Sequence, residues 1–117
     1  MSEEEFIPFD TATQQATADY DEAVQRLRRE QEVNDFRTLM GLKEGRRFVR
    51  RLLETTGVTR TSFSTDALLM AFKEGNRNLG IMLMDEIAQT CPKRYGQMQK
   101  EFEDDERRLA RTARTER

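Results

Sequence analysis

Hydrophobic residues recur three and four positions apart along most of the chain, which is the spacing of amphipathic helices. This pattern predicts helices over about residues 19–40, 44–56, 66–90 and 92–110. The first range holds either one long helix or two helices joined near Asn34. The sequence therefore predicts an all-α fold, a compact bundle of four to five helices with extended N- and C-terminal segments.

Capping residues, glycines and a proline mark the expected helix ends. Asp19 followed by Glu22 matches the acidic form of a capping box and predicts a helix start there. Gly41 marks a break before the second helix, and Gly57 is well placed to end it. Pro92 suits the first position of the last helix.

Residues 55–65 carry seven hydroxyl side chains in eleven positions and predict a loop. Phe63 is the expected anchor of this loop in the core. The loop is expected to end in a helix cap whose oxygen comes from Ser64, Thr65 or Asp66.

The predicted helix at 66–90 is the most apolar of the four, so we expect it at the centre of the fold. Its main apolar stripe consists of Leu69, Phe72, Leu79, Leu83 and Ile87. Gly75 and Gly80 lie inside it, and each costs about 1 kcal/mol of helix propensity relative to alanine. The expected compensation is close approach of another helix at both glycines.

Charge divides the chain into three parts. Residues 1–33 hold nine acids and three arginines (−6), residues 34–102 eight acids and twelve bases (+4), and residues 103–117 five of each. We therefore expect an acidic N-terminal arm and helix, a folded helical domain and a charged C-terminal helical tail. Attraction between the acidic N-terminal part and the basic middle part suggests self-association. Solvated helix faces explain the same charge pattern.

The N-terminal arm contains three large apolar residues, Phe6, Ile7 and Phe9, around Pro8. Apolar side chains in a polar arm favour burial. Either the arm folds back onto its own domain, or these residues dock on a neighbouring subunit in an extended conformation.

Arginines form the most basic patch, on the helix predicted at 44–56. Arg46, Arg47, Arg50 and Arg51 form two pairs four residues apart, opposite the apolar face. Arginine favours planar, bidentate partners, so the expected ligands are carboxylates of a partner subunit or of the first 33 residues, or DNA phosphate. The isoelectric point of about 5.3 argues against a dedicated nucleic-acid domain.

The residue inventory excludes several kinds of chemistry. Histidine is absent and Cys91 is the single cysteine, so His-based catalysis and an internal disulfide are excluded. The acids at 101–106 are typical of a solvated helix face rather than a calcium loop. We predict no enzymatic activity, no cofactor and no metal. The sequence also predicts no membrane span, and its acidic start is unlike a signal peptide.

One nine-residue stretch is echoed 30 positions later. LMGLKEGRR at 39–47 and LMAFKEGNR at 69–77 share six identities, including Gly45 with Gly75. The echo indicates either two related segments that cross near these glycines or a coincidence in a helical protein of simple composition.

Several motifs occur in a fixed order. DFRTLMGLKEGRRFVRRLLETTGV, at 35–58, precedes TSF at 61–63, FKEGNRNLG at 72–80 and TCPKRYGQMQKE at 90–101. This order resembles a family of small tailed-phage (podophage) proteins of uncharacterised role, named after a Bordetella phage protein. Where that family often has Pro-Glu-Gly at the first helix break, this chain has Lys43-Glu44-Gly45.

The resemblance implies a non-enzymatic phage protein of virion structure or assembly that acts in head and tail morphogenesis through protein contacts. Its partners would be other phage structural proteins or the chain itself, in an oligomeric assembly located in the virion or the host cytoplasm. The alternative is a small DNA-binding or host-modulating accessory protein that uses the arginine face. Structural roles are expected for Gly45, Gly75, Arg77, Asn78 and Gly80. Arg77 would either pair with Glu74 or cap a neighbouring helix, and Asn78 would need a cross-helix hydrogen bond.

Overall fold

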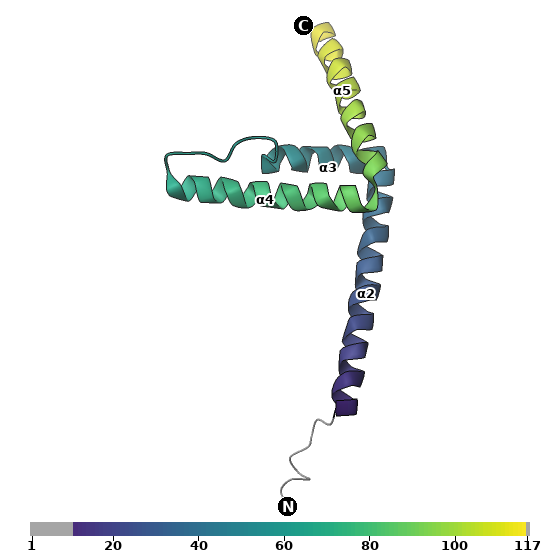
Figure 1. Ribbon diagram of the computed structural model, residues 1–117. Helices are drawn as coiled ribbons and strands as arrows, with labels where there is room; N and C mark the ends of the chain where they lie inside the picture. Colours follow the sequence, from purple (N-terminus) through teal and green to yellow (C-terminus); the bar gives the residue numbers. More distant parts are fainter. Residues whose placement is uncertain (1–10, 117) are drawn as a thin grey trace, which may run out of the picture. The chain divides into compact units, whose positions relative to one another are not determined.

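The computed structural model describes residues 11–116, which form four helices and contain no strand (Figure 1). These are α2 (Thr11–Gly41), α3 (Lys43–Thr56), α4 (Ala67–Thr90) and α5 (Pro92–Thr115). The predicted all-α fold is confirmed. None of the helices in this part of the chain is long and apolar enough to cross a membrane. The chain divides into two units, residues 1–35 and 36–117.

In the first unit, α2 begins at Thr11, so the predicted start near Asp19 is wrong. Residues 11–18 include alanine and glutamine and no glycine or proline, so nothing there breaks a helix. Asp19 does not cap the helix but accepts a hydrogen bond from Gln15 Nε2 one turn earlier, at 2.9 Å. The helix also continues through Asn34, which selects one long helix over two. Tyr20 and Leu27 on this helix are exposed.

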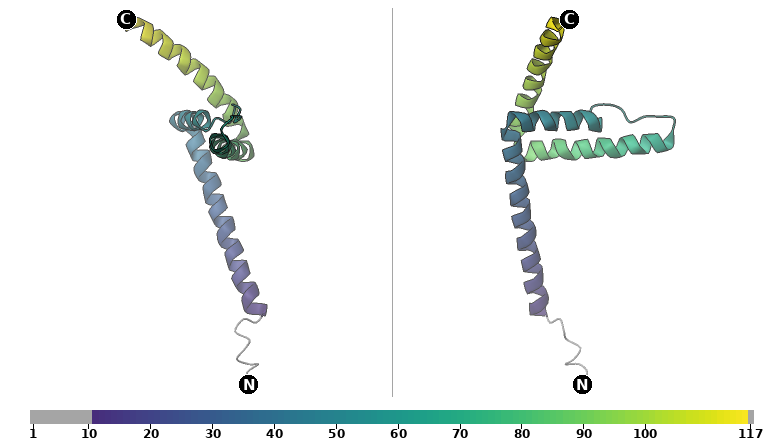
Figure 2. Two further views of the ribbon diagram at one scale, coloured as in Figure 1. Left: turned by 90° about the vertical axis from the view of Figure 1, so that its left-hand side faces the viewer. Right: turned by 180° about the vertical axis from the view of Figure 1, so that it is seen from behind.

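In the second unit, α3 and α4 lie side by side as an antiparallel hairpin, and α5 packs on both (Figures 1 and 2). A small core is buried where the last turns of α2 meet the other helices. It consists of Met40, Val49, Leu53, Ile87 and Met98. Each of the four helices contributes at least one of these side chains, so the core depends on all of them.

The break between α2 and α3 is at Leu42, one residue after Gly41, which marked the predicted break. Gly45 lies within the first turn of α3 and is buried. A Cβ atom there would lie 1.9 Å from the Leu39 carbonyl oxygen, so only glycine lets α3 start this close to the end of α2.

The loop between α3 and α4 follows Gly57, whose positive φ of 69° ends α3. Asp66 caps α4 by accepting a hydrogen bond from the backbone N–H of Leu69 at 3.0 Å, which selects it among the three expected caps. Ser62 donates a hydrogen bond to Glu74. Phe63 is 73% exposed, so the prediction that it anchors the loop in the core is wrong. Val58 packs against the core instead, and polar contacts hold the later part of the loop.

The two glycines of α4 lie in different surroundings. A Cβ atom at Gly80 would lie 2.3 Å from Thr56 Oγ1 and 2.8 Å from Val58 Cβ, so the end of α3 approaches closely there. A Cβ atom at Gly75 would meet nothing within 4 Å. The expected close approach is therefore present at Gly80 and absent at Gly75, and the structure has no crossing that pairs Gly45 with Gly75.

A polar joint connects α2, α4 and α5. Arg37 Nε donates to the Thr90 carbonyl oxygen at 2.9 Å, across 53 positions of the chain. Thr90 Oγ1 in turn donates to the Glu86 carbonyl oxygen at 2.7 Å. Pro92 then starts α5, as predicted, and this helix continues to Thr115, beyond its expected end near residue 110.

Candidate functional site

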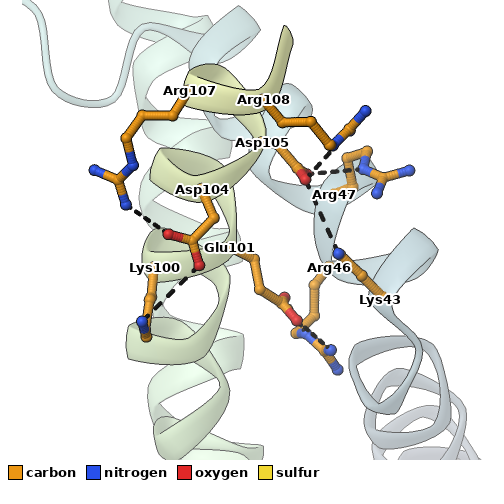
Figure 3. Close-up of polar contacts among 9 residues, drawn as sticks. All are labelled: Lys43, Arg46, Arg47, Lys100, Glu101, Asp104, Asp105, Arg107 and Arg108. Atoms are coloured by element: carbon orange, nitrogen blue, oxygen red, sulfur yellow. Dashed lines mark hydrogen bonds and ion pairs between the residues drawn. The ribbon is translucent and has the colours of Figure 1, made fainter. Parts of the chain in front are cut away.

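The predicted arginine patch is partly an internal structure. Arg46 was expected on an exposed face, yet its side chain is only 6% exposed. Its Nε and Nη2 donate to Glu101 Oε1 and Oε2 at 2.7 and 2.8 Å (Figure 3). Its Nη1 donates to the Met40 carbonyl oxygen at 2.9 Å. One guanidinium therefore joins the end of α2, α3 and α5.

The Arg46–Glu101 pair changes the titration of both groups. The hydrogen bond from Arg46 lowers the pKa of the Glu101 carboxyl, against the opposing effect of burial. The same hydrogen bond raises the pKa of the Arg46 guanidinium. Both groups are therefore charged at neutral pH, and the pair is an ion pair rather than a neutral hydrogen bond.

A second ionic cluster surrounds Asp105 on α5. Figure 3 shows three cations around this carboxylate: Lys43 Nζ at 3.9 Å, Arg47 Nε at 3.3 Å and Arg108 Nη2 at 3.4 Å. Burial tends to raise the pKa of the Asp105 carboxyl, but the hydrogen bond from Arg108 and the charges of Lys43 and Arg47 lower it overall. The cluster joins the start of α3 to the middle of α5.

The other two arginines lie over aromatic rings. Arg50 Nη1 is 3.2 Å from Glu54 Oε2, and its guanidinium carbon is 3.8 Å from the centre of the Phe102 ring. The guanidinium carbon of Arg51 is 5.1 Å from the centre of the Phe48 ring. The first contact directs Arg50 toward α5, and the second holds Arg51 along the surface of α3.

Two arginines of this face, Arg46 and Arg47, therefore meet carboxylates of α5, which were not among the ligands expected from the sequence. The described contacts of Arg46 and Arg47 are with Glu101 and Asp105. The acidic run at 101–106 was interpreted as a solvated face, but these two carboxylates point to α3 (Figure 3). A sequence pattern gives no signal for this pairing because the partners are more than 50 positions apart.

A groove of about 580 Å³ lies between α3 and α5. Its apolar residues are Met98, Phe102 and Leu109. Its rim is built of both charges: Lys43, Arg47, Arg50, Arg51, Arg108, Glu54, Glu101, Asp105 and Glu106. Because most of these charges pair with each other, the groove offers little unbalanced charge to a phosphate.

The largest departure from the sequence prediction is on α4. Leu68, Phe72, Leu79 and Met82 are 85, 66, 58 and 66% exposed. We call these four residues together with Gly75 the α4 stripe. Phe72 and Leu79 were expected in the core, but of the predicted apolar stripe only Ile87 is buried, with Leu83 packed against the core.

The lengths of the helices explain the exposure of Leu68 and Phe72. α3 has 14 residues and α4 has 24, so α3 ends at Thr56, beside Gly80. The N-terminal half of α4 extends past the end of α3 and has no helix of the same unit along its outer side (Figure 1). A helical wheel shows that a face is apolar but not whether the chain itself covers it.

The remaining predicted residues occupy separate places. Arg77 pairs with Glu74 at 3.5 Å, as expected, and Asn78 is exposed. Cys91 is half-buried beside the core, and its Sγ lies 3.4 Å from Thr90 Oγ1. Residues 6–9, with the predicted partner-binding Phe6, Ile7 and Phe9, lie outside the described residues.

Comparison with known proteins gives one match. Residues 36–100, more than half of the chain, match the family model of the Bbp19-like phage proteins. The match covers α3, α4, the core and the first turns of α5. No curated protein and no solved structure shows a significant match.

Proposed function

The chain belongs to the family of Bbp19-like phage proteins, and from this premise we propose that it acts in virion structure or assembly through contacts with other proteins. In this proposal it is a non-enzymatic component of head and tail morphogenesis, located in the virion or in the host cytoplasm.

The observation that carries the proposal is the α4 stripe. Its four large side chains, Leu68, Phe72, Leu79 and Met82, are each more than half exposed on one helix. Large contiguous apolar patches are uncommon on monomeric soluble proteins and mark surfaces that bind other proteins. Burial of such side chains contributes most of the free energy in helix–helix contacts.

The arginines of α3 support protein contact more than DNA contact. Arg46, Arg47 and Arg50 already contact carboxylates of the same chain, so phosphate would have to displace these carboxylates. Arg51 keeps a position on the outer surface, where it can add a polar contact at the rim of a protein interface.

The experiment that tests the proposal replaces the gene in the phage that encodes the chain. Phage that carry Phe72→Glu together with Leu79→Glu are compared with phage that carry Ile81→Glu. Ile81 is an apolar residue on the same helix, two positions from Leu79 and therefore on another face. Infectious yield is counted, and the copy number of the chain in purified particles is measured by quantitative mass spectrometry.

We expect a large loss of infectious particles with the double variant and near-normal yield with Ile81→Glu. A fixed copy number per particle identifies a virion component, whereas absence from particles with loss of yield identifies an assembly factor. Normal yield from a phage that lacks the gene, with the chain absent from particles, would contradict the proposal.

A further inference from the structure

We propose that the α4 stripe binds the α4 helix of a second copy of this chain, in antiparallel orientation, with the two Gly75 residues at the crossing point. This inference rests on the proposed function, in which the same surface binds a protein. It identifies the bound protein as a second copy of the chain.

The spacing of the stripe is that of a coiled-coil seam. Leu68, Phe72, Gly75, Leu79 and Met82 follow each other at intervals of four, three, four and three residues. This heptad spacing keeps side chains on one narrow line along a helix and favours packing against one other helix. A globular surface or an extended peptide would not require such a narrow line.

Gly75 interrupts the seam with an empty position. A Cβ atom there would meet nothing within 4 Å, so no contact among residues 11–116 accounts for a glycine that weakens the helix. A glycine in the middle of an apolar seam lets the backbone of a second helix approach closely. Ala71 and Asn78 flank the seam, four residues before and three residues after Gly75. Both are exposed and uncharged, as expected near the centre of an interface.

The stripe is self-complementary in one orientation. Leu68 and Met82 lie seven residues before and after Gly75, while Phe72 and Leu79 lie three before and four after it. Two copies placed antiparallel about Gly75 therefore bring Leu68 of each beside Met82 of the other. Phe72 of each then fills the space above Gly75 of the other. Such a contact closes with twofold symmetry and leaves no unpaired end.

The helix dipoles also favour the antiparallel orientation. Antiparallel pairing opposes the dipoles of the two α4 helices, whereas parallel pairing would align them. With the crossing at Gly75, residues 67–83 of the two helices overlap, and Asp85 and Glu86 lie beyond the overlap. Lys73, Glu74 and Arg77 are the charged residues of the overlap and lie off the seam, so the orientation depends on the dipoles and on the position of Gly75.

The first test is the oligomeric state of the full chain by sedimentation equilibrium. We expect a dimer with a dissociation constant in the micromolar range, because a seam of about four turns is at the small end of protein interfaces. Phe72→Glu is expected to weaken the dimer at least tenfold, and Ile81→Glu to leave it within about twofold of the wild type. Circular dichroism verifies that both variants stay folded.

The second test measures orientation with single cysteines in a Cys91→Ser background. Gly75→Cys is expected to form a disulfide-linked dimer. Leu68→Cys alone is expected to stay unlinked, because fourteen residues of helix separate the two copies of this position by about 21 Å. A mixture of Leu68→Cys with Met82→Cys is expected to form the mixed dimer.

Several outcomes would overturn the inference. A monomeric chain would mean that the N-terminal arm or another phage protein covers the stripe, and linkage of Leu68→Cys to itself would mean parallel pairing. If the chain is monomeric but Phe72→Glu with Leu79→Glu still abolishes phage yield, the proposed function stands and only the second copy is excluded as the partner. If the chain is a dimer, phage that lack the gene give normal yield and the chain is absent from particles, the results support this inference and contradict the proposed function.

Discussion

Arg46 and Glu101 form a two-point ion pair across 55 positions of the chain, with Nε–Oε1 and Nη2–Oε2 distances of 2.7 and 2.8 Å. The third donor of the guanidinium, Nη1, binds the Met40 carbonyl oxygen, which the end of α2 leaves without a helical partner. The pair thus fixes α5 against the corner where α2 ends and α3 begins. With five residues in the buried core, this unit depends on such polar connections more than a larger domain would.

Glu101→Gln is expected to lower the free energy of unfolding by about 3 kcal/mol, because it leaves the charge of Arg46 buried without a carboxylate. Urea denaturation followed by circular dichroism measures this loss. Glu103→Gln is the matched control, since Glu103 is exposed on the same helix and the substitution is identical. Equal stability of the two variants would show that the pair contributes no more than a surface ion pair.

The same pair predicts a loss of stability in acid. The pKa of Glu101 is lowered by folding, so the unfolded chain binds its proton more readily than the folded chain. The contribution of the pair is therefore fully present above the usual glutamate value of 4.5 and is lost as the pH falls below it, through the folded pKa. Asp105 acts in the same direction below its usual value of 3.8.

The measurement is the free energy of unfolding of the wild type and of Glu101→Gln over a pH series. The difference between the two proteins is expected to be constant near neutral pH and to shrink below pH 4.5. A difference that stays constant to the lowest pH at which both proteins fold would contradict the lowered pKa.

Alanine substitutions at Gly45 and Gly75, which occupy equivalent positions of the two similar nine-residue stretches, are expected to change stability in opposite directions. Gly45→Ala is expected to destabilise the protein by at least about 2 kcal/mol, since its Cβ would collide with the Leu39 carbonyl group. Gly75→Ala is expected to stabilise the monomer by up to about 1 kcal/mol, since alanine favours the helix and meets no atom within 4 Å. Thermal unfolding at low protein concentration compares them, and an equal loss in both would contradict the contrast.

The sequence predicted where helices lie better than which faces they bury. The helix expected at 44–56 is observed at Lys43–Thr56, and the helix expected at 66–90 is observed at Ala67–Thr90. The bounds agree because glycine, proline and capping residues act on the backbone next to them. The start of α2 was missed because residues 11–18 contain no residue that excludes a helix and none that requires one.

Burial could not be predicted in the same way because it depends on what packs beside each helix. Phe72 and Ile87 belong to one apolar pattern on α4, yet only Ile87 lies where α3 and α5 meet it. Arg46 and Arg51 are likewise equivalent in sequence, and only the first faces a carboxylate of α5. Such outcomes depend on helix lengths and on partners distant in sequence.

The last prediction concerns the two arginines that lie over aromatic rings. Arg50→Glu with Arg51→Glu is expected to leave the helical content unchanged and to cost about 1 kcal/mol of stability. The reason is the loss of the Arg50–Phe102 ring contact and the repulsion that a glutamate at 50 would feel from Glu54. The matched control is Arg111→Glu with Arg114→Glu, which makes the same charge change near the end of α5.

Binding to nonspecific duplex DNA, measured by fluorescence anisotropy between about 50 and 200 mM salt, shows whether these arginines contact phosphate. We expect weak binding with a shallow salt dependence, equal in the two double variants, because three of the four arginines already contact carboxylates. Each phosphate contact adds about 0.9 to the slope of log K against log salt. A steep slope that disappears only with Arg50→Glu and Arg51→Glu would instead establish α3 as a DNA-binding surface, and the α4 stripe would then be a means of presenting two such surfaces.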